Sequence, residues 1–343
     1  MTMKGNCRTT AMGIMPHRDI NRALDLALSL DIPYWPQLPR YSYYEDMYVQ
    51  VSEHFPGILV DEAQQRITLN SEAFYEGLGE YAEKSGNDEF FKLSPAYSAV
   101  LDAFLERDLS GYDYIRGQSI GPISFGFKIV DENLKPIIYN EEIKGFLYDF
   151  ISLKTNVQYR QLLEKHPGAF MWLDEPGLEI IFGSFTGYTS DRAKVEFASF
   201  LSGLEGPKGV HLCGNPDWTF LLKGLGLDVL SMDAYGLGHI FTRYAEDVRD
   251  FLQGGGIISW GIVPTLTEDF SGESVEALVL KLEGLWGNLV ARGISLKDIL
   301  RQSWLAPARC CLVNADGADT VERAFATLKA VSTVLRDKYN LAD

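Results

Sequence analysis

The stretch AFMWLDEP, residues 169–176, shows the pattern from which the fold of this chain can be predicted. Five apolar residues, Ala169–Leu173, are followed at once by two carboxylates and by a proline, which cannot continue a hydrogen-bonded strand. A short apolar run of this kind is typical of a strand that is buried on both faces of a parallel sheet. We therefore expect a buried strand over Ala169–Leu173 that ends in polar side chains.

Similar apolar runs recur along the 343 residues and alternate with segments of helical periodicity. The runs are Ala11–Met15, Ile32–Trp35, Tyr114–Ile120, Gly209–Leu212, Val229–Met232, Ile257–Ile262 and Cys310–Val313, the last with a start that could lie as early as Trp304. Helical patterns cover Asn21–Leu30, with Asp19 or Asn21 as N-cap, and also Ser274–Leu289 and Thr320–Leu335. Eight strands that alternate with helices predict an α/β fold, a closed (β/α)8 TIM barrel, with a doubly wound open sheet as the alternative.

The longest interval between two predicted strands contains the segment Arg40–Asp113. Its apolar residues at Ile58–Val60 and Arg66–Leu69 predict a hairpin that is followed by helices. We expect an insertion of about residues 41–112 after the second strand, within a single domain that spans residues 1–343.

Composition and charge restrict the classes of partner. The net charge is −16, whereas nucleic acids and anionic membrane surfaces require clustered Lys and Arg, so neither partner is expected. This charge does not speak against a small anionic ligand in a local basic pocket. No apolar run approaches the roughly 18–20 residues of a membrane span, and residues 1–12 lack the apolar core of a secretory signal. Because the four cysteines do not suggest a disulfide framework, a reduced, cytoplasmic location is expected.

Polar side chains cluster at the ends of the predicted strands. In TIM barrels the active site forms at the carboxyl ends of the strands, so these residues are candidates for function. They are His17, Gln37, Arg40, Asp174, Glu175, His211, Cys213, Asp233 and either Cys310 or Cys311.

His211 and Cys213 are the first candidates for metal binding. They lie two residues apart, so on a strand their side chains point to the same side. A lone His-x-Cys would be explained as well by a buried thiol beside a satisfied histidine. The cysteine pair at Cys310 and Cys311 favours zinc, for which thiolate and imidazole are suitable ligands. Because consecutive strand residues alternate, only one of that pair is expected to face inward.

Carboxylates would complete the site. Asp233 ends the strand after His211 and could bind zinc or hold the imidazole of His211. Asp174 could hold an ammonium group or act as a base, whereas a solvated turn would also explain Glu175. Cys7 has no partner in this pattern and is expected in a loose N-terminal arm.

Several motifs, in order along nearly the whole chain, resemble the C-terminal catalytic barrel of cobalamin-independent methionine synthase. The segment Thr9–His17 resembles the opening strand of that barrel, Gly121–Ser124 is similar to its Gly-Pro-Val-Thr, and Leu173–Leu178 to its Ile-Asp-Glu-Pro-Ala-Leu. His211–Cys213 matches its His-x-Cys, Asp228–Asp233 the stretch that ends in its zinc-binding glutamate, and Cys310–Leu312 its Cys-Gly-Leu. His211–Asn215 is also similar to corrinoid-dependent methyltransferases of the uroporphyrinogen decarboxylase-like superfamily.

The resemblance implies a zinc-dependent barrel that activates the thiol of homocysteine for methylation. It implies His211, Cys213 and Cys310 as zinc ligands, with Asp233 in the place of the glutamate, and Asp174 as the residue that holds the amino group. The segment with Met12, Gly13 and Ile14, together with Glu175, would complete the substrate site.

Two departures bear on the substrates. Ile14 replaces a serine that touches the amino acid, and Lys128 stands where a folate-stacking tryptophan is expected. The family's separate N-terminal barrel has no counterpart in these residues. A methylated corrinoid, carried by a separate protein, is therefore the expected donor.

Other activities stay open. A thiol methyltransferase that acts on coenzyme M would use the same residues. A related decarboxylase should show an arginine-rich pocket and would not need the cysteines. A zinc- or corrinoid-binding protein without activity is the third alternative.

Overall fold

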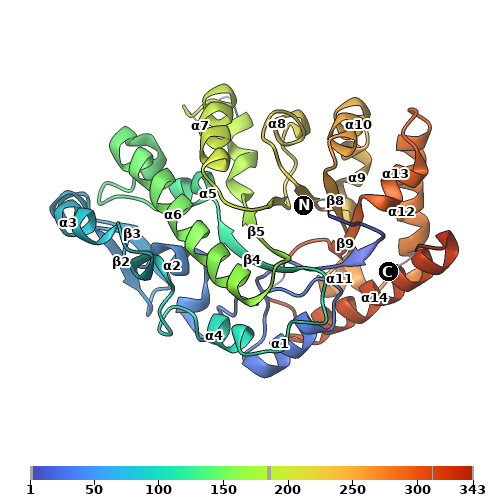
Figure 1. The fold of residues 1–343 in the computed structure, drawn as a ribbon, viewed down its shortest axis with the longest axis horizontal. Coiled ribbons are helices and arrows are strands. Elements are labelled where there is room, and N and C mark those ends of the chain that lie inside the picture. The colour runs from blue at the N-terminus through green and yellow to red at the C-terminus, as the bar shows by residue number, and fades with distance from the viewer. Residues whose placement is uncertain (1–2, 184–186, 311, 342–343) are drawn as a thin grey trace.

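The protein is described by a computed structural model, which covers residues 3–183, 187–310 and 312–341 (Figure 1). Seven parallel strands form one sheet in the order β1-β9-β8-β7-β6-β5-β4, and two antiparallel strands, β2 and β3, form a separate hairpin. The strands are β1 (Arg8–Thr9), β2 (Ile58–Asp61), β3 (Arg66–Leu69), β4 (Ile115–Ile120), β5 (Ala169–Asp174), β6 (Lys208–Leu212), β7 (Val229–Met232), β8 (Ile257–Val263) and β9 (Ser303–Pro307).

Helices surround the curved sheet (Figure 1). Asp19, predicted as a possible N-cap, accepts a hydrogen bond from the backbone of Arg22 at the start of α1. The helices, with η marking a 3₁₀ helix, are α1 (Ile20–Leu28), η1 (Tyr43–Glu45), α2 (Met47–Ser52), α3 (Ser71–Lys84), η2 (Asp88–Phe91), α4 (Ala99–Leu105), α5 (Pro122–Lys128), η3 (Ile137–Tyr139), α6 (Glu141–Lys165), η4 (Pro176–Phe182), α7 (Ser190–Ser202), α8 (Trp218–Leu222), α9 (Ala234–Phe241), α10 (Ala245–Gln253), α11 (Thr267–Phe270), α12 (Val275–Val290), α13 (Leu296–Arg301) and α14 (Asp319–Tyr339).

Residues 32–37 occupy the eighth position and close the barrel. On one side the backbone N–H of Ile32 donates to the carbonyl of Thr9 (3.0 Å). On the other side the N–H of Trp35 donates to the carbonyl of Arg116 in β4 (3.2 Å). The segment thus lies between the two edge strands of the sheet. The predicted TIM-like α/β barrel is confirmed, and the open doubly wound sheet is not the fold.

The first two predicted strands are less regular than expected. The strand predicted over Ile32–Trp35 is reduced to a single bridge between Tyr34 and Arg116. Pro33 and Pro36 explain the difference, because each removes a backbone donor that a ladder needs.

The predicted run Ala11–Met15 is irregular as well. The regular strand of this region is β1, at Arg8–Thr9, and the run itself contributes a single bridge between Ile14 and Gln37. The predicted run therefore lacks the continuous hydrogen-bonded ladder of a regular strand.

The last predicted strand is also displaced. It was expected over Cys310–Val313, but β9 covers Ser303–Pro307, close to the alternative start at Trp304. Pro307 ends the strand, so Cys310 lies in the following loop, and Cys311 lies outside the described residues. The alternation of strand side chains therefore does not decide between the two cysteines.

The segment between residues 37 and 115 contains the predicted hairpin, β2 and β3, and helices on both sides of it. In Figure 1 the hairpin and α3 lie at the edge of the molecule that is farthest from α12 and α14. Helix α2 reaches the barrel mouth, where the Gln37 side-chain amide donates to Gln50 of α2 (2.7 Å) and Gln50 donates to Glu45 (2.8 Å). This buried chain of hydrogen bonds fixes α2 to the carboxyl ends of the strands.

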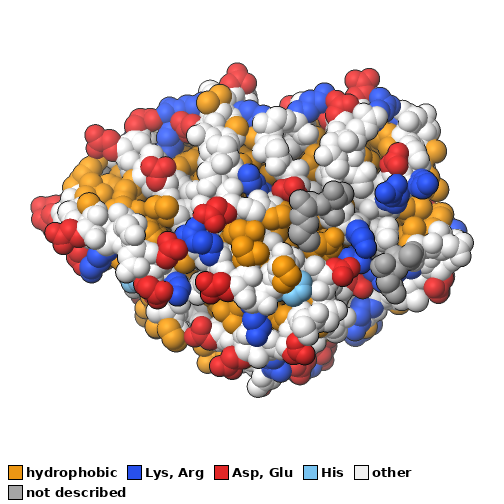
Figure 2. Space-filling model, in the orientation of Figure 1, with side chains coloured by type: hydrophobic (Ala, Val, Ile, Leu, Met, Phe, Trp, Pro, Cys, Tyr) orange, Lys and Arg blue, Asp and Glu red, His pale blue; other side chains and the backbone are white. Residues whose placement is uncertain are grey.

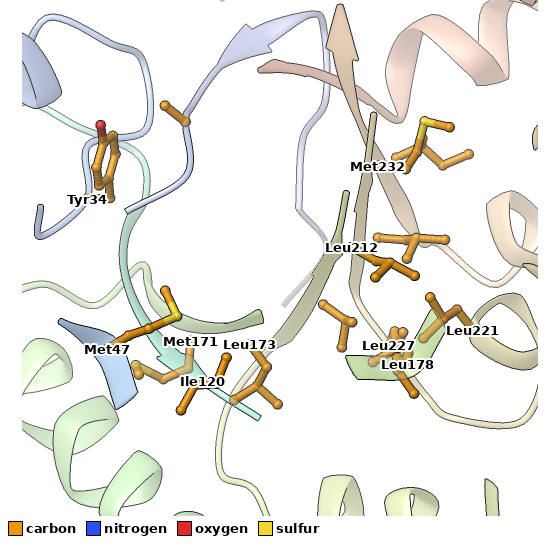
Figure 3. Close-up of a cluster of buried hydrophobic side chains, with 14 of the residues drawn as sticks. Tyr34, Met47, Ile120, Met171, Leu173, Leu178, Leu212, Leu221, Leu227 and Met232 are labelled. Carbon is orange, nitrogen blue, oxygen red and sulfur yellow. The ribbon is translucent and has the colours of Figure 1, made fainter. Parts of the chain in front are cut away.

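The core has two parts. The larger part packs side chains of the strands against the helices. Figure 3 shows a portion of it, in which Ile120, Met171 and Leu173 gather beside Met47 of α2. The smaller part fills the amino-terminal end of the barrel interior; it contains Met3, Ile32, Tyr114, Phe170, Trp172, Val229, Ile257 and Trp304. No helix in the described parts of the chain is long and apolar enough to cross a membrane.

The N-terminal arm is packed, contrary to the expectation of a loose segment. Cys7 is fully buried; its N–H donates to Ser303 of β9 (2.8 Å), and the Ser332 hydroxyl donates to its carbonyl (2.7 Å). Burial raises the pKa of its thiol to about 12. On the face drawn in Figure 2, Lys and Arg side chains are interspersed with Asp and Glu and form no broad basic field among the described residues.

Candidate functional site

The carboxyl ends of β5, β6 and β7 bring the predicted site residues together. In the parallel ladder Asp174 is paired with His211, and His211 with Ser231. Because side chains alternate along a strand, Asp174, His211 and Ser231 share the inner side of the barrel with Trp172. The site is therefore a direct consequence of strand register.

His211 is held as a neutral imidazole. It is buried, with Nδ1 at 2.9 Å from the Ser231 hydroxyl and Nε2 at 2.7 Å from the Cys213 sulfur. Burial, reinforced by the charge of Arg116, lowers the pKa of His211 to about 3. A neutral imidazole whose Nδ1 is fixed by a hydroxyl presents Nε2 to the thiols, the arrangement expected of a metal-binding histidine.

Cys213 and Cys310 lie side by side although they are far apart in the sequence. The Cys213 thiol donates a hydrogen bond to the Cys310 sulfur, which lowers the pKa of Cys310 and raises that of Cys213. Cys310 is an exposed residue and Cys213 is a half-buried one. An incoming thiol could therefore reach this pair, as a catalytic zinc site requires.

Asp233 is buried and has two partners. One oxygen accepts from the backbone of Gly236 (2.8 Å) and caps α9, and the other forms an ion pair with Arg309 (2.5 Å). For Asp233 to become a ligand, its carboxylate would have to leave at least one of these contacts.

The donor set suits zinc, although the side chains are not preassembled around an ion. One imidazole nitrogen and two thiols, from His211, Cys213 and Cys310, are the ligand types that zinc prefers. In the described residues, however, no group of three or more His, Cys, Asp or Glu side chains is arranged to hold a metal ion. Zinc binding would thus require small side-chain movements that separate the mutually bonded donors.

Asp174 faces the same space and is supported by an aromatic column. It accepts a hydrogen bond from the Trp172 indole (2.9 Å), and the Arg116 guanidinium lies 4.3 Å from the centre of the Trp172 ring. Burial raises the pKa of Asp174 to about 6, while Arg116 and the Trp172 bond oppose that rise. At neutral pH the carboxyl is therefore ionised and can attract an ammonium group.

Glu175 has a different role from its neighbour. It is fully buried, and its carboxylate accepts from the backbone of Ile123 (3.1 Å) and Ser124 (2.8 Å) at the start of α5. A solvated turn is therefore wrong for Glu175. Gly121 is required here, because a Cβ at that position would lie 2.1 Å from Oε1 of Glu175. Burial raises the pKa of Glu175 to about 7, and these hydrogen bonds oppose the rise.

The predicted substrate segment lies near one of the two thiols, that of Cys310. Met12 and Ile14 line a small cavity together with Arg309 and Cys310. Gly13 allows the closure of the barrel, since a Cβ there would lie 2.2 Å from the side chain of Gln118.

The other strand-end candidates are bound to nearby elements. His17 contacts Glu322 of α14 (3.0 Å), and Arg40 donates to the carbonyl of Leu312 (3.3 Å). Gln37 belongs to the hydrogen-bonded chain with α2. These three residues support the mouth of the barrel.

Sequence reasoning missed two arginines. Arg116 lies inside the predicted run Tyr114–Ile120 and is not among the predicted site residues; its position against Trp172 follows from tertiary packing. Arg309 precedes Cys310 directly, so its position beside the predicted ligands was a usable signal.

Sequence comparisons find no match: no family model fits the chain, and no curated protein is similar to it. Among solved structures, a methyltransferase from Methanosarcina mazei superimposes with a TM-score of 0.56 at 14% identity, over 97% of this chain and 94% of that one. A B12-independent methionine synthase from Shewanella sp., in complex with selenomethionine, gives a TM-score of 0.43 at 13% identity, over 67% of this chain and 64% of that one. This chain thus spans slightly less than two thirds of the synthase. The Methanosarcina structure shows that the two proteins share a fold.

Proposed function

We propose that this protein is a zinc-dependent methyltransferase that methylates a thiol, with homocysteine as the acceptor and a methylated corrinoid as the donor. The observation that carries the proposal is the convergence of His211, Cys213 and Cys310 at the mouth of a TIM-like barrel. The Methanosarcina methyltransferase, which has the same fold over nearly the full length of both chains, supports the same reaction class.

Different residues are proposed to bind zinc and to bind the substrate. His211, Cys213 and Cys310 would hold zinc, and Asp233, now paired with Arg309, is the candidate for a fourth ligand. Zinc, when bound, would lower the pKa of the substrate thiol and keep a thiolate available at neutral pH. Asp174 would orient homocysteine through its ammonium group, which places the sulfur for attack.

The reaction itself is a methyl transfer. The thiol loses its proton, and a sulfur–carbon bond forms while the cobalt–methyl bond of the donor breaks. The electron pair of that bond stays on cobalt. Because Cys310 is an exposed residue, the methylated donor would approach the bound thiol from this side of the barrel mouth.

The donor and acceptor can be tested together. Purified zinc-loaded protein is incubated with homocysteine and either methylcobalamin or methyltetrahydrofolate, and methionine is measured. We expect methionine with methylcobalamin and little or none with the folate. Comparable rates with the folate would make the donor assignment wrong. Methylation of coenzyme M but not of homocysteine would make the acceptor assignment wrong.

Zinc is tested separately. Metal analysis should find about one zinc per chain, and the zinc-edge absorption spectrum should change when homocysteine is added, because a sulfur ligand is gained. Full methyl transfer by metal-free protein would contradict the proposal.

A further inference from the structure

Arg309 is a cation at the mouth of the barrel, beside Asp233 and directly before Cys310 in the chain. Its side chain is 44% exposed, whereas its partner Asp233 is completely buried. The loop that carries it is fixed to β8, because the N–H of Ala308 donates to Val263 (2.7 Å) and the hydroxyl of Thr265 donates to the carbonyl of Arg309 (2.9 Å). The guanidinium is therefore held in place and open to a ligand.

We propose that Arg309 binds the anionic group of the acceptor, so that the enzyme selects thiols that bear a carboxylate or a sulfonate. This inference rests on the proposed thiol methylation at the same site. It assigns to Arg309 a role in substrate specificity that neither the motifs nor the comparisons suggest.

A cation and an anion both lie near the Cys310 sulfur. The Cys310 sulfur lies close enough to both Asp174 and Arg309 to interact with the two charges, and Arg309 also interacts with Cys213. Homocysteine is a zwitterion with a thiol. Its ammonium and carboxylate groups share one carbon, so Asp174 can take the first and Arg309 the second while the thiol reaches the cysteines.

Ile14 supports the same conclusion. It lines the small cavity that Arg309 and Cys310 also line. An isoleucine offers no hydrogen bond to a carboxylate, whereas a guanidinium presents five N–H donors in a fork that fits one. The contact with Asp233 engages the Nη2 atom and holds the fork in one orientation.

Asp233 also limits what Arg309 can bind. The ion pair compensates the Arg309 charge in part, so a ligand with several negative charges would meet the surrounding carboxylates of Asp233 and Asp174. A ligand with one anionic group is the better match, and an accompanying ammonium group improves it further.

Calorimetric binding of three thiols distinguishes this role from a structural one. Homocysteine bears a carboxylate, 2-mercaptoethanesulfonate bears a sulfonate, and 2-mercaptoethanol bears neither. In Arg309→Gln we expect the dissociation constants of the two anionic thiols to rise by about ten- to a hundredfold, as for the loss of a charged hydrogen bond. The constant for 2-mercaptoethanol should change by less than about twofold, and Arg309→Lys should restore part of the loss.

Arg309→Gln leaves Asp233 buried without its partner, and Arg309→Lys, which keeps a cation beside that carboxylate, controls for this change. A further variant provides the second control. Arg22→Gln removes an exposed arginine that pairs with Glu322 on α14 and should leave all three constants unchanged.

The outcomes separate the two proposals. Equal losses for all three thiols, no loss in Arg309→Gln, or no binding of anionic thiols by the unmodified protein would each overturn the role of Arg309. If the unmodified protein binds anionic thiols and the variant does not, but no donor supports methyl transfer, the role of Arg309 stands and the proposed reaction fails.

Discussion

The same strands build two layers of opposite chemistry inside the barrel. At the amino-terminal end the interior is filled by Tyr114, Phe170 and Trp304, all buried, with ring centres of Phe170 and Trp304 5.6 Å apart. Two strand positions further along, the inward side chains include Arg116 and Trp172, and at the carboxyl end they are polar. The difference shows that the lower layer provides burial and the upper layer provides chemistry.

Arg116 and Trp172 mark the boundary between the layers. The guanidinium is completely buried between the rings of Tyr34 (4.8 Å) and Trp172 (4.3 Å), and burial lowers its pKa to about 10. It remains protonated at neutral pH. A buried positive charge at this level opposes protonation of His211 and favours ionisation of Asp174. Arg116 therefore influences the charge states of the polar residues in the upper layer.

The largest effect should come from the upper layer. We expect the double variant His211→Ala, Cys213→Ser to lose its zinc and all detectable methyl transfer, because two of the proposed ligands are removed. Metal analysis and methionine formation measure this. Retention of a full zinc complement by the folded variant would exclude these residues as ligands.

A substitution in the lower layer should reduce stability and leave zinc binding unchanged. Phe170→Ala removes a fully buried ring and should lower the free energy of unfolding by about 3–5 kcal/mol, measured by urea denaturation. The zinc content of the protein that remains folded should not change. A loss below about 1 kcal/mol would mean that the layer is loosely packed.

The two late cysteines should differ from each other. Loss of a residue that only hydrogen-bonds to a metal ligand typically lowers metal affinity by roughly 10–100-fold. Cys310 contacts Cys213 and is proposed as a ligand itself, so Cys310→Ser is expected to lower zinc affinity by more than that. Cys311→Ser serves as the matched control and should retain zinc. The reverse result would assign the ligand to Cys311.

The smallest effect is expected at Asp174. Asp174→Asn keeps the shape of the side chain and should raise the KM for homocysteine by about tenfold, since a charged contact with the ammonium group is lost. Zinc content should be normal, and its loss would make Asp174 a ligand.

The pH dependence of the same contact has a defined direction. The pKa of Asp174 is raised to about 6, so the carboxylate is present above that pH and becomes protonated below it. Homocysteine affinity should therefore fall as the pH drops through about 6 in the unmodified protein. The Asn variant, which cannot titrate there, should lack this step.

The sequence by itself determined the α/β alternation, the hairpin after the second strand and the coincidence of polar residues with strand ends. These are local features. An apolar run that stops at a polar residue, such as Ala169–Asp174, predicts a buried strand with a polar end, whatever the position of that strand in the sheet. The grouping of His211 with Cys213 also followed from their spacing alone.

Only the tertiary structure decided which polar groups are already bonded and which face the site. Glu175 caps α5, Asp233 holds Arg309, and Cys310 joins Cys213 from a loop instead of a strand. Each of these contacts joins residues that are far apart in the chain. Local periodicity cannot specify such contacts. A buried charge must be paired or hydrogen-bonded, and its partner is set by the packing of the barrel and not by the neighbouring sequence.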